Sequence, residues 1–102
     1  MILVVMFCIG IFSNAYGQFS EQVTVCNSEG QKIVFYTDGT VRVSNNGQIA
    51  GRGTYKSGGS TVELFLTLSG TYSEWEGTYL VSRETGRVIS VTINRSKYTP
   101  CR

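Results

Sequence analysis

The stretch VELFLTLSGTYSEWEGTYLV, residues 62–81, decides the fold. In its first part the aliphatic residues stand at positions 62, 64, 66 and 68, while Thr61, Glu63, Phe65 and Thr67 point to the other face. This period of two is typical of a half-buried antiparallel strand. We predict a polar loop over residues 69–74 and a second strand over residues 75–81, which begins with the only tryptophan, Trp75. The middle of the core of an all-β domain is therefore expected in this strand pair.

The first residues have the pattern of a secretory leader. Residues 1–12 are apolar and uncharged, and small and polar residues follow them. This pattern predicts a signal peptide over residues 1–17, cleaved after Ala15 or Gly17, and a secreted β domain over residues 18–102. A buried N-terminal helix or strand is the alternative, and the run is shorter than the roughly 20 apolar residues of a membrane span. We expect an extracellular or periplasmic protein with no stable membrane insertion.

Removal of the leader also settles the cysteine count. Cys8 lies in the leader, so Cys26 and Cys101 remain, and an oxidising compartment favours a disulfide between them. Closing so long a loop stabilises a fold by about 4 kcal/mol in the chain-entropy model. Two free thiols or metal ligands are the alternative, but the chain contains no histidine to complete a zinc site. No metal and no cofactor are predicted.

Short β-prone segments and glycine-containing turns run through the remaining chain. We predict about seven antiparallel strands in an up-and-down meander that closes as a small barrel or folds as a two-layer sandwich. The strands whose bounds the pattern gives are residues 22–26, 32–37, 40–44, 62–68 and 75–81.

The turns predict the register of the hairpins. We expect two-residue turns at residues 38–39 and 58–59, and three-residue loops at residues 45–47 and 84–86. The resulting pairs are Tyr36–Val41, Val34–Val43, Tyr55–Val62, Val81–Ile89, Tyr79–Val91 and Gly77–Ile93. The loop at 45–47 also brings Val43 and Ile49 to one face.

This register places Ile33 and Phe35 on the face opposite Val34 and Tyr36. There they are expected to cover the disulfide or to form an exposed apolar patch for a partner.

The types of residue present exclude most catalytic arrangements. Without histidine there is no Ser-His or Cys-His pair. Glu74 and Glu76 flank Trp75 and would lie roughly 7 Å apart on a strand, as in inverting glycosidases. The simpler interpretation is that both glutamates face water while Trp75 faces the core. We therefore predict a protein that is not an enzyme and has no catalytic residues.

Charge and aromatic content narrow the range of ligands. Nine basic and seven acidic residues give a net charge of +2, and they are interspersed, which does not favour nucleic-acid binding. Tyr72, Tyr36, Phe35 and Trp75 would line an apolar pocket if the barrel were hollow. In so small a domain we expect the protein's own side chains to fill the interior.

Asn94 begins a glycosylation sequon, which has meaning only in a eukaryotic secretory pathway.

The predicted loop at 69–74 is the best candidate for recognition, because loops on a rigid sheet commonly carry function. The candidate binding residues are Ser69, Gly70, Tyr72, Glu74 and Trp75.

Several segments together resemble a known family. A leader, a cysteine in the first strand, SGTY at residues 69–72, WEG at 75–77 and YTPC at 98–101 are similar to the layout of small secreted bacterial inhibitors of C-type lysozyme. The resemblance implies a β-barrel joined by a disulfide near its ends, with a loop that enters the lysozyme cleft. It assigns that role to Ser69 and Tyr72.

Some residues depart from that family. The spacing from Gly70 to Tyr72 is shorter than in the family pattern, and Glu76 stands where the family tends to carry a basic or small residue. The sequence therefore predicts a secreted non-enzymatic β domain that binds a partner, with a protein as the candidate, through its loops or an open sheet face. An inhibitor of an enzyme such as C-type lysozyme is one alternative. A lipocalin-like carrier of a small apolar ligand is another, although the N-terminal Gly-x-Trp signature is absent.

Overall fold

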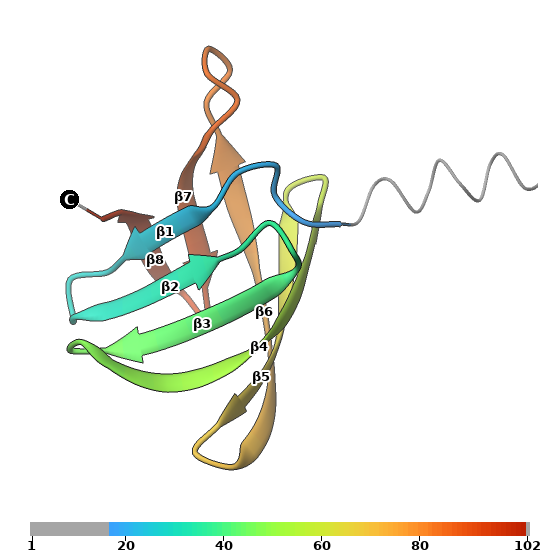
Figure 1. Ribbon diagram of the computed structural model, residues 1–102. Coiled ribbons are helices and arrows are strands. Elements are labelled where there is room, and N and C mark those ends of the chain that lie inside the picture. The colour runs from blue at the N-terminus through green and yellow to red at the C-terminus, as the bar shows by residue number, and fades with distance from the viewer. Residues whose placement is uncertain (1–16, 102) are drawn as a thin grey trace, which may run out of the picture.

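The structure is a computed structural model that describes residues 17–101. Eight antiparallel strands form one closed barrel in simple chain order (Figure 1). The strands are β1 (Val23–Cys26), β2 (Gln31–Phe35), β3 (Thr40–Asn45), β4 (Gln48–Gly58), β5 (Thr61–Leu68), β6 (Thr71–Val81), β7 (Val88–Ile93) and β8 (Ser96–Pro100). The predicted all-β meander is thus confirmed, and it closes as a barrel.

The eighth strand, β8, was not predicted. It is short, it ends in the only proline, and only Tyr98 among its side chains is buried. The strand pairs with β7 on one side and with β1 on the other, so it closes the barrel. The proline is tolerated because it lies at the end of the strand.

The core has its centre where the alternating stretch predicted it. Val62, Leu64 and Leu66 are fully buried, and Leu68 and Trp75 pack against the same cluster. The intervening positions of β5 face outward, as expected from the period of two.

The predicted register of β2 and β3 is wrong by one residue. Phe35 pairs with Val41 and Ile33 pairs with Val43, in place of Tyr36–Val41 and Val34–Val43. Ile33 and Phe35 are fully buried in the core, and they form no exposed patch. A shift of one residue exchanges the two faces of a strand.

The cause of this shift lies in the turn. The Asp38 carboxylate accepts hydrogen bonds from the Thr40 amide at 2.9 Å and the Thr40 hydroxyl at 2.6 Å. Of the two turn residues, only Gly39 is left-handed, with φ +92°. The N–H of Tyr36 donates to the carbonyl of Thr40 at 2.9 Å, which leaves three residues in the loop. A two-residue turn would have required a positive φ at Asp38 as well.

The β3–β4 turn differs from its prediction in the opposite direction. Asn46 and Gly47 both have positive φ, 52° and 87°, and they form a two-residue turn between Asn45 and Gln48. A bulge after Val43 then restores the inward face of β3, and Val43 pairs with Gly51. Ile49 is 47% exposed, so the predicted common face for Val43 and Ile49 is wrong.

The β4–β5 turn lies one position later than predicted on the chain. Gly58 pairs with Thr61, and Tyr55 pairs with Leu64 in place of Val62. The difference is two residues in register, which leaves every side chain on its predicted face. Tyr55 and Val62 are accordingly both buried.

The β6–β7 hairpin is partly as predicted. The pairs Tyr79–Val91 and Gly77–Ile93 are confirmed. An irregularity after Leu80 places Val81 opposite Val88, so the predicted pair with Ile89 is wrong.

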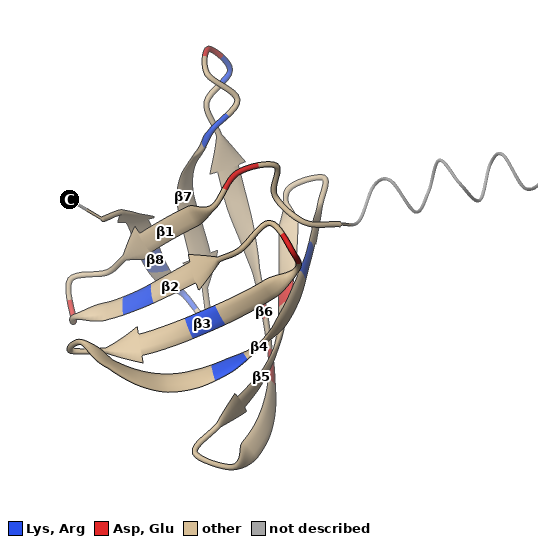
Figure 2. Cartoon of the chain, in the orientation of Figure 1, with Lys and Arg blue, Asp and Glu red and all other residues tan. Residues whose placement is uncertain are grey.

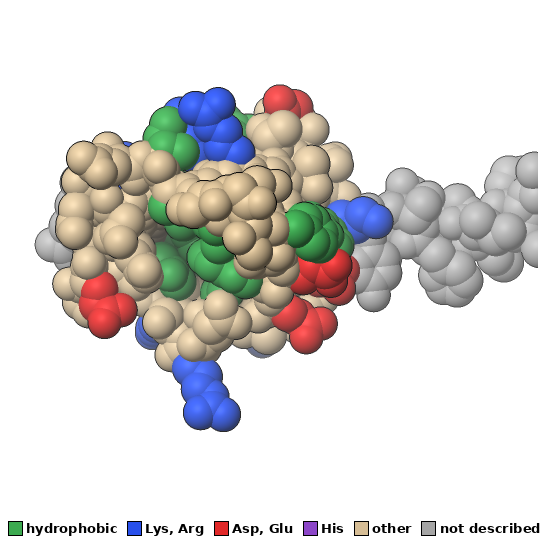
Figure 3. All heavy atoms as spheres, turned by 90° about the horizontal axis from the view of Figure 1, so that it is seen from below, with side chains coloured by type: hydrophobic (Ala, Val, Ile, Leu, Met, Phe, Trp, Pro, Cys, Tyr) green, Lys and Arg blue, Asp and Glu red, His purple; other side chains and the backbone are tan. Residues whose placement is uncertain are grey.

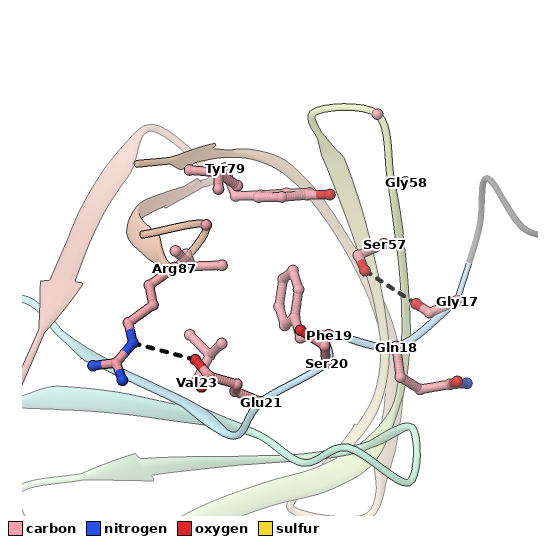
Figure 4. Close-up of a pocket in the computed structure, with 14 residues that line it drawn as sticks. Gly17, Gln18, Phe19, Ser20, Glu21, Val23, Ser57, Gly58, Tyr79 and Arg87 are labelled. Carbon is pink, nitrogen blue, oxygen red and sulfur yellow. Dashed lines mark hydrogen bonds and ion pairs between the residues drawn. The ribbon is translucent and has the colours of Figure 1, made fainter. Parts of the chain in front are cut away.

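One end of the barrel is closed by the N-terminal segment. The Phe19 ring packs against the rings of Phe35, Tyr55 and Tyr79, with centroids 5.3, 5.4 and 5.1 Å away. The segment is held before this point by Gly17, which exchanges two backbone hydrogen bonds of 2.7 Å with Ser57. The Gly17 carbonyl also accepts a hydrogen bond from the Ser57 hydroxyl (Figure 4). Nothing in the sequence pattern predicted this closure.

The predicted disulfide is confirmed. Cys26 at the end of β1 is bonded to Cys101, which follows β8, and their Cα atoms are 5.1 Å apart. The bond therefore joins the two strands that close the barrel. The predicted leader, with Cys8 and Ala15, lies outside the described residues except for Gly17. Residues 17–101 contain no helix with the length and apolar character of a membrane span.

Candidate functional site

The predicted loop at residues 69–74 is much shorter in the structure. Leu68 pairs with Thr71, so only Ser69 and Gly70 connect β5 to β6, with φ of 52° and 83°. Two consecutive left-handed residues make a tight turn whose twist matches the strands. The other predicted loop residues belong to β6, and the end of the hairpin projects beyond the neighbouring strands (Figure 1).

The hairpin brings four of the five candidate binding residues together. Ser69 and Gly70 form the exposed tip, and Tyr72 and Glu74 follow it on the outer face of β6. The Tyr72 hydroxyl donates a hydrogen bond of 3.0 Å to the Glu74 carboxylate. Trp75 does not belong to this group, because it packs against the core.

The electrostatics of this pair favour a protonated tyrosine. Partial desolvation raises the pKa of the Tyr72 phenol, and the hydrogen bond to the Glu74 carboxylate raises it further. The phenol is therefore a hydroxyl donor at neutral pH. With 59% of Tyr72 exposed, a large aromatic ring stands on the outside of a rigid hairpin.

The two glutamates beside Trp75 face water while Trp75 faces the core, as the simpler interpretation of the sequence predicted. Glu74 and Glu76 are exposed on the outer face, while Trp75 lies on the inner side. Glu76 pairs with Glu63 on β5, which is also exposed. No group of three or more potential metal ligands occurs in residues 17–101.

The four aromatic residues considered for an apolar pocket do not line one cavity. Phe35 and Trp75 belong to the core, whereas Tyr72 is exposed and Tyr36 lies beside Arg42 on the outer face. The interior of the barrel is filled by the protein's own side chains, with Tyr55 and Phe35 the largest.

A cavity of about 440 Å³ does open at the end of the barrel that Phe19 closes (Figure 4). Its lining includes Val23, Tyr79 and Val88, and an ion pair of 3.5 Å between Arg87 and Glu21 lies at the site. Both side chains of this ion pair are well exposed, so it adds little stability. Sequence reasoning missed the cavity because its walls come from segments far apart in the chain.

Seen from the end at which the hairpin projects, the surface is mostly polar, with hydrophobic side chains visible in its middle (Figure 3).

The glycosylation sequon lies on the β7–β8 turn, where Asn94 and Arg95 are exposed and have φ of 51° and 69°. An oligosaccharide on Asn94 would therefore meet no obstacle from the barrel core.

The fold and this surface define an antiparallel β-barrel with one disulfide and a projecting hairpin. Comparisons with known proteins found no matching family model, no matching curated protein and no matching solved structure.

Proposed function

We propose that this protein is a secreted, non-enzymatic barrel that binds a protein partner through the end of its β5–β6 hairpin. The observation that carries this proposal is Tyr72, a tyrosine that is 59% exposed while its hydroxyl is held by Glu74. Secretion is supported by the disulfide, because such bonds persist in oxidising compartments.

The geometry of the hairpin suits recognition of a protein. Tyrosine is among the residues that contribute most to interface energies, since it buries a large ring and offers a polar group. The tight turn at Ser69 and Gly70 and the full pairing of β5 with β6 leave little freedom to be lost on binding. A preorganised aromatic side chain on a projecting element can enter a concave surface of a partner.

The proposal is tested by photo-crosslinking from the hairpin. A photoreactive phenylalanine replaces Tyr72 in the secreted protein, and a matched variant carries it at Thr78, an exposed position of the same strand. We expect crosslinks to one partner from position 72 and not from position 78. Equal crosslinking from both positions, or none from position 72, would contradict the proposal.

Inhibition of a C-type lysozyme is the sharper alternative within this class. It is favoured by the position of Ser69 at the tip and of Tyr72 beside it on a convex hairpin, a shape that fits an active-site cleft. The test is titration of a C-type lysozyme with the protein, measured as hydrolysis of cell walls. We expect stoichiometric inhibition that Tyr72→Ala weakens by about tenfold or more, the effect of losing one interface anchor. Undiminished hydrolysis in excess protein would exclude lysozyme as the partner.

The carrier alternative receives no comparable support. The described barrel interior is filled by buried side chains, which leaves its centre no room for an apolar ligand.

A further inference from the structure

The outer face of β2, β3 and β4 carries basic residues and no acidic ones. Lys32, Arg42 and Arg52 lie on these three strands in turn. Figure 2 shows basic bands on β2, β3 and β4 on the same side of the barrel. Arg42 and Arg52 are direct cross-strand partners. Like charges in this position repel one another and destabilise a sheet. A group of opposite charge would compensate the repulsion between the two arginines.

We propose that Arg42 and Arg52 form a binding site for a tetrahedral oxyanion, a sulfate or phosphate group. This site is separate from the proposed partner surface at the hairpin tip. A groove of about 670 Å³ lies over the pair, and its lining includes Tyr36, Thr54 and Thr67. The groove is formed by paired β-strands, whose backbone fixes the positions from which these side chains project.

The two arginines lack protein partners for their charges. Within residues 17–101 neither guanidinium forms an ion pair or a side-chain hydrogen bond. The Nε atom of Arg42 is shielded from solvent and has no hydrogen-bond partner there. A buried donor without an acceptor is costly, and an anion that binds the other N–H groups of this guanidinium in the groove would offset that cost by balancing its charge.

The Tyr36 ring favours one orientation of the Arg42 side chain. Its guanidinium carbon lies 5.7 Å from the centroid of the Tyr36 ring, within the range of a cation–π contact. The planar group is thereby preorganised, which lowers the entropy lost when it binds a ligand.

The groups around the pair define the ligand. Thr67 lies opposite Arg52 on β5, and Thr54 lies two residues from it on β4, so two residues that carry hydroxyl groups line the groove next to Arg52. Arginine matches phosphate and sulfate oxygens through paired N–H donors. A dianion balances both positive charges, whereas a single carboxylate balances only one.

The site is tested by titration with inorganic sulfate and inorganic phosphate, with sodium chloride at matched ionic strength as the reference. NMR follows the arginine Nε–H signals and the amides of Thr54 and Thr67. We expect saturable shifts with sulfate or phosphate and only small linear ones with chloride. Shifts that do not exceed those with chloride would overturn the proposal.

Variants locate the binding. Arg52→Gln is expected to raise the Kd by about tenfold or more, since it removes a charged donor pair. Lys56→Gln, an exposed basic residue of the same strand that does not line the groove, is the matched control and should bind as the wild type does. Equal weakening by both variants would show mere screening and would overturn the site. Arg52→Lys, which keeps the charge without the planar fork, replaces the glutamine variant if that variant fails to fold, and it should also bind more weakly.

A second pair of titrations identifies the source of the oxyanion. Tighter binding of a sulfated disaccharide than of inorganic sulfate assigns the group to a saccharide, because the Tyr36 ring at the groove offers a surface for a sugar. Equal binding assigns the site to the free ion. Tyr72→Ala should leave anion binding unchanged, so this site and the hairpin surface can fail independently.

Discussion

Tyr55 connects the core to the segment that closes the barrel. Its hydroxyl accepts a hydrogen bond of 3.0 Å from the Phe19 amide and donates one of 2.7 Å to the carbonyl of Tyr36. The side chain is 2% exposed. Burial raises the pKa of the Tyr55 phenol above the ordinary value of 10.0, and the hydrogen bond from the Phe19 amide opposes this in part. Tyr55 thus packs in the core, binds the segment that closes the barrel, and carries a phenol whose titration depends on that burial.

This titration predicts a loss of stability in alkali. In the unfolded chain the phenol loses its proton near pH 10, while in the folded protein it keeps the proton to higher pH. The contribution of Tyr55 is therefore complete below pH 10 and is lost as pH rises through the folded pKa. Urea unfolding at increasing pH should show a steeper decline for the wild type than for Tyr55→Phe. The variant should also lose about 1–2 kcal/mol at neutral pH, because the Phe19 amide loses its acceptor. Tyr36→Phe, which removes a phenol from the outer face, is the control, and parallel curves for wild type and Tyr55→Phe would contradict the prediction.

At the scale of elements, the turns show what the sequence determines and what it leaves open. Asp38-Gly39 and Asn46-Gly47 are both strong hairpin signals, and both sites are hairpins. Their loop lengths are the reverse of those predicted, because the Asp38 side chain binds Thr40 while Asn46 takes the left-handed conformation itself. The glycines are visible in the sequence, but the choice between these two conformations depends on side-chain bonds that the pattern of apolar residues does not encode.

The candidate site was also predictable only in part. The hairpin brings together the candidates Ser69, Gly70, Tyr72 and Glu74, but the sequence did not show that the turn is only two residues long or that Tyr72 and Glu74 belong to β6. A Ser-Gly turn is a weaker signal than Asn-Gly. The closure by Phe19 and the groove at Arg42 depend on contacts between residues far apart in the chain, and no local period reveals them.

The N-terminal segment makes a prediction about processing. Gly17 gives and receives a backbone hydrogen bond with Ser57, and its carbonyl also accepts a bond of 3.0 Å from the Ser57 hydroxyl. Cleavage of the proposed leader after Ala15 keeps these bonds, whereas cleavage after Gly17 removes them. We expect intact mass measurement of the secreted protein to give a chain that begins at Tyr16.

The energetic basis of this expectation can be measured separately. A chain produced to begin at Gln18 should be less stable than one that begins at Tyr16 by about 1–3 kcal/mol, the cost of leaving the nearly buried Ser57 groups without partners. A secreted chain that begins at Gln18, or equal stability of the two chains, would refute the prediction.

For the whole molecule, closure of the barrel is least supported where its two ends meet. β5 and β6 share eight residue pairs, whereas β1 and β8 share only two, Val25–Pro100 and Cys26–Thr99. One of these pairs involves proline, which has no N–H to donate. The disulfide between Cys26 and Cys101 lies directly at this seam, and its sequence separation of 75 spans nearly the whole described chain. The bond therefore supplies a connection that the backbone hydrogen bonds of β1 and β8 supply only weakly.

Replacement of both cysteines tests this role. The variant carrying Cys26→Ser and Cys101→Ser should unfold in urea with a free energy about 4 kcal/mol lower than that of the wild type, as expected for loss of so long a covalent loop. Hydrogen exchange should show where the loss is felt, with the amides of β1 and β8 opening before those of β5 and β6, because partial opening can begin at the seam. Wild type in the presence of a reductant is the matched comparison, since it loses the bond without any substitution. Unchanged stability, or uniform exchange across all strands, would mean that the eight strands hold the barrel closed without the disulfide.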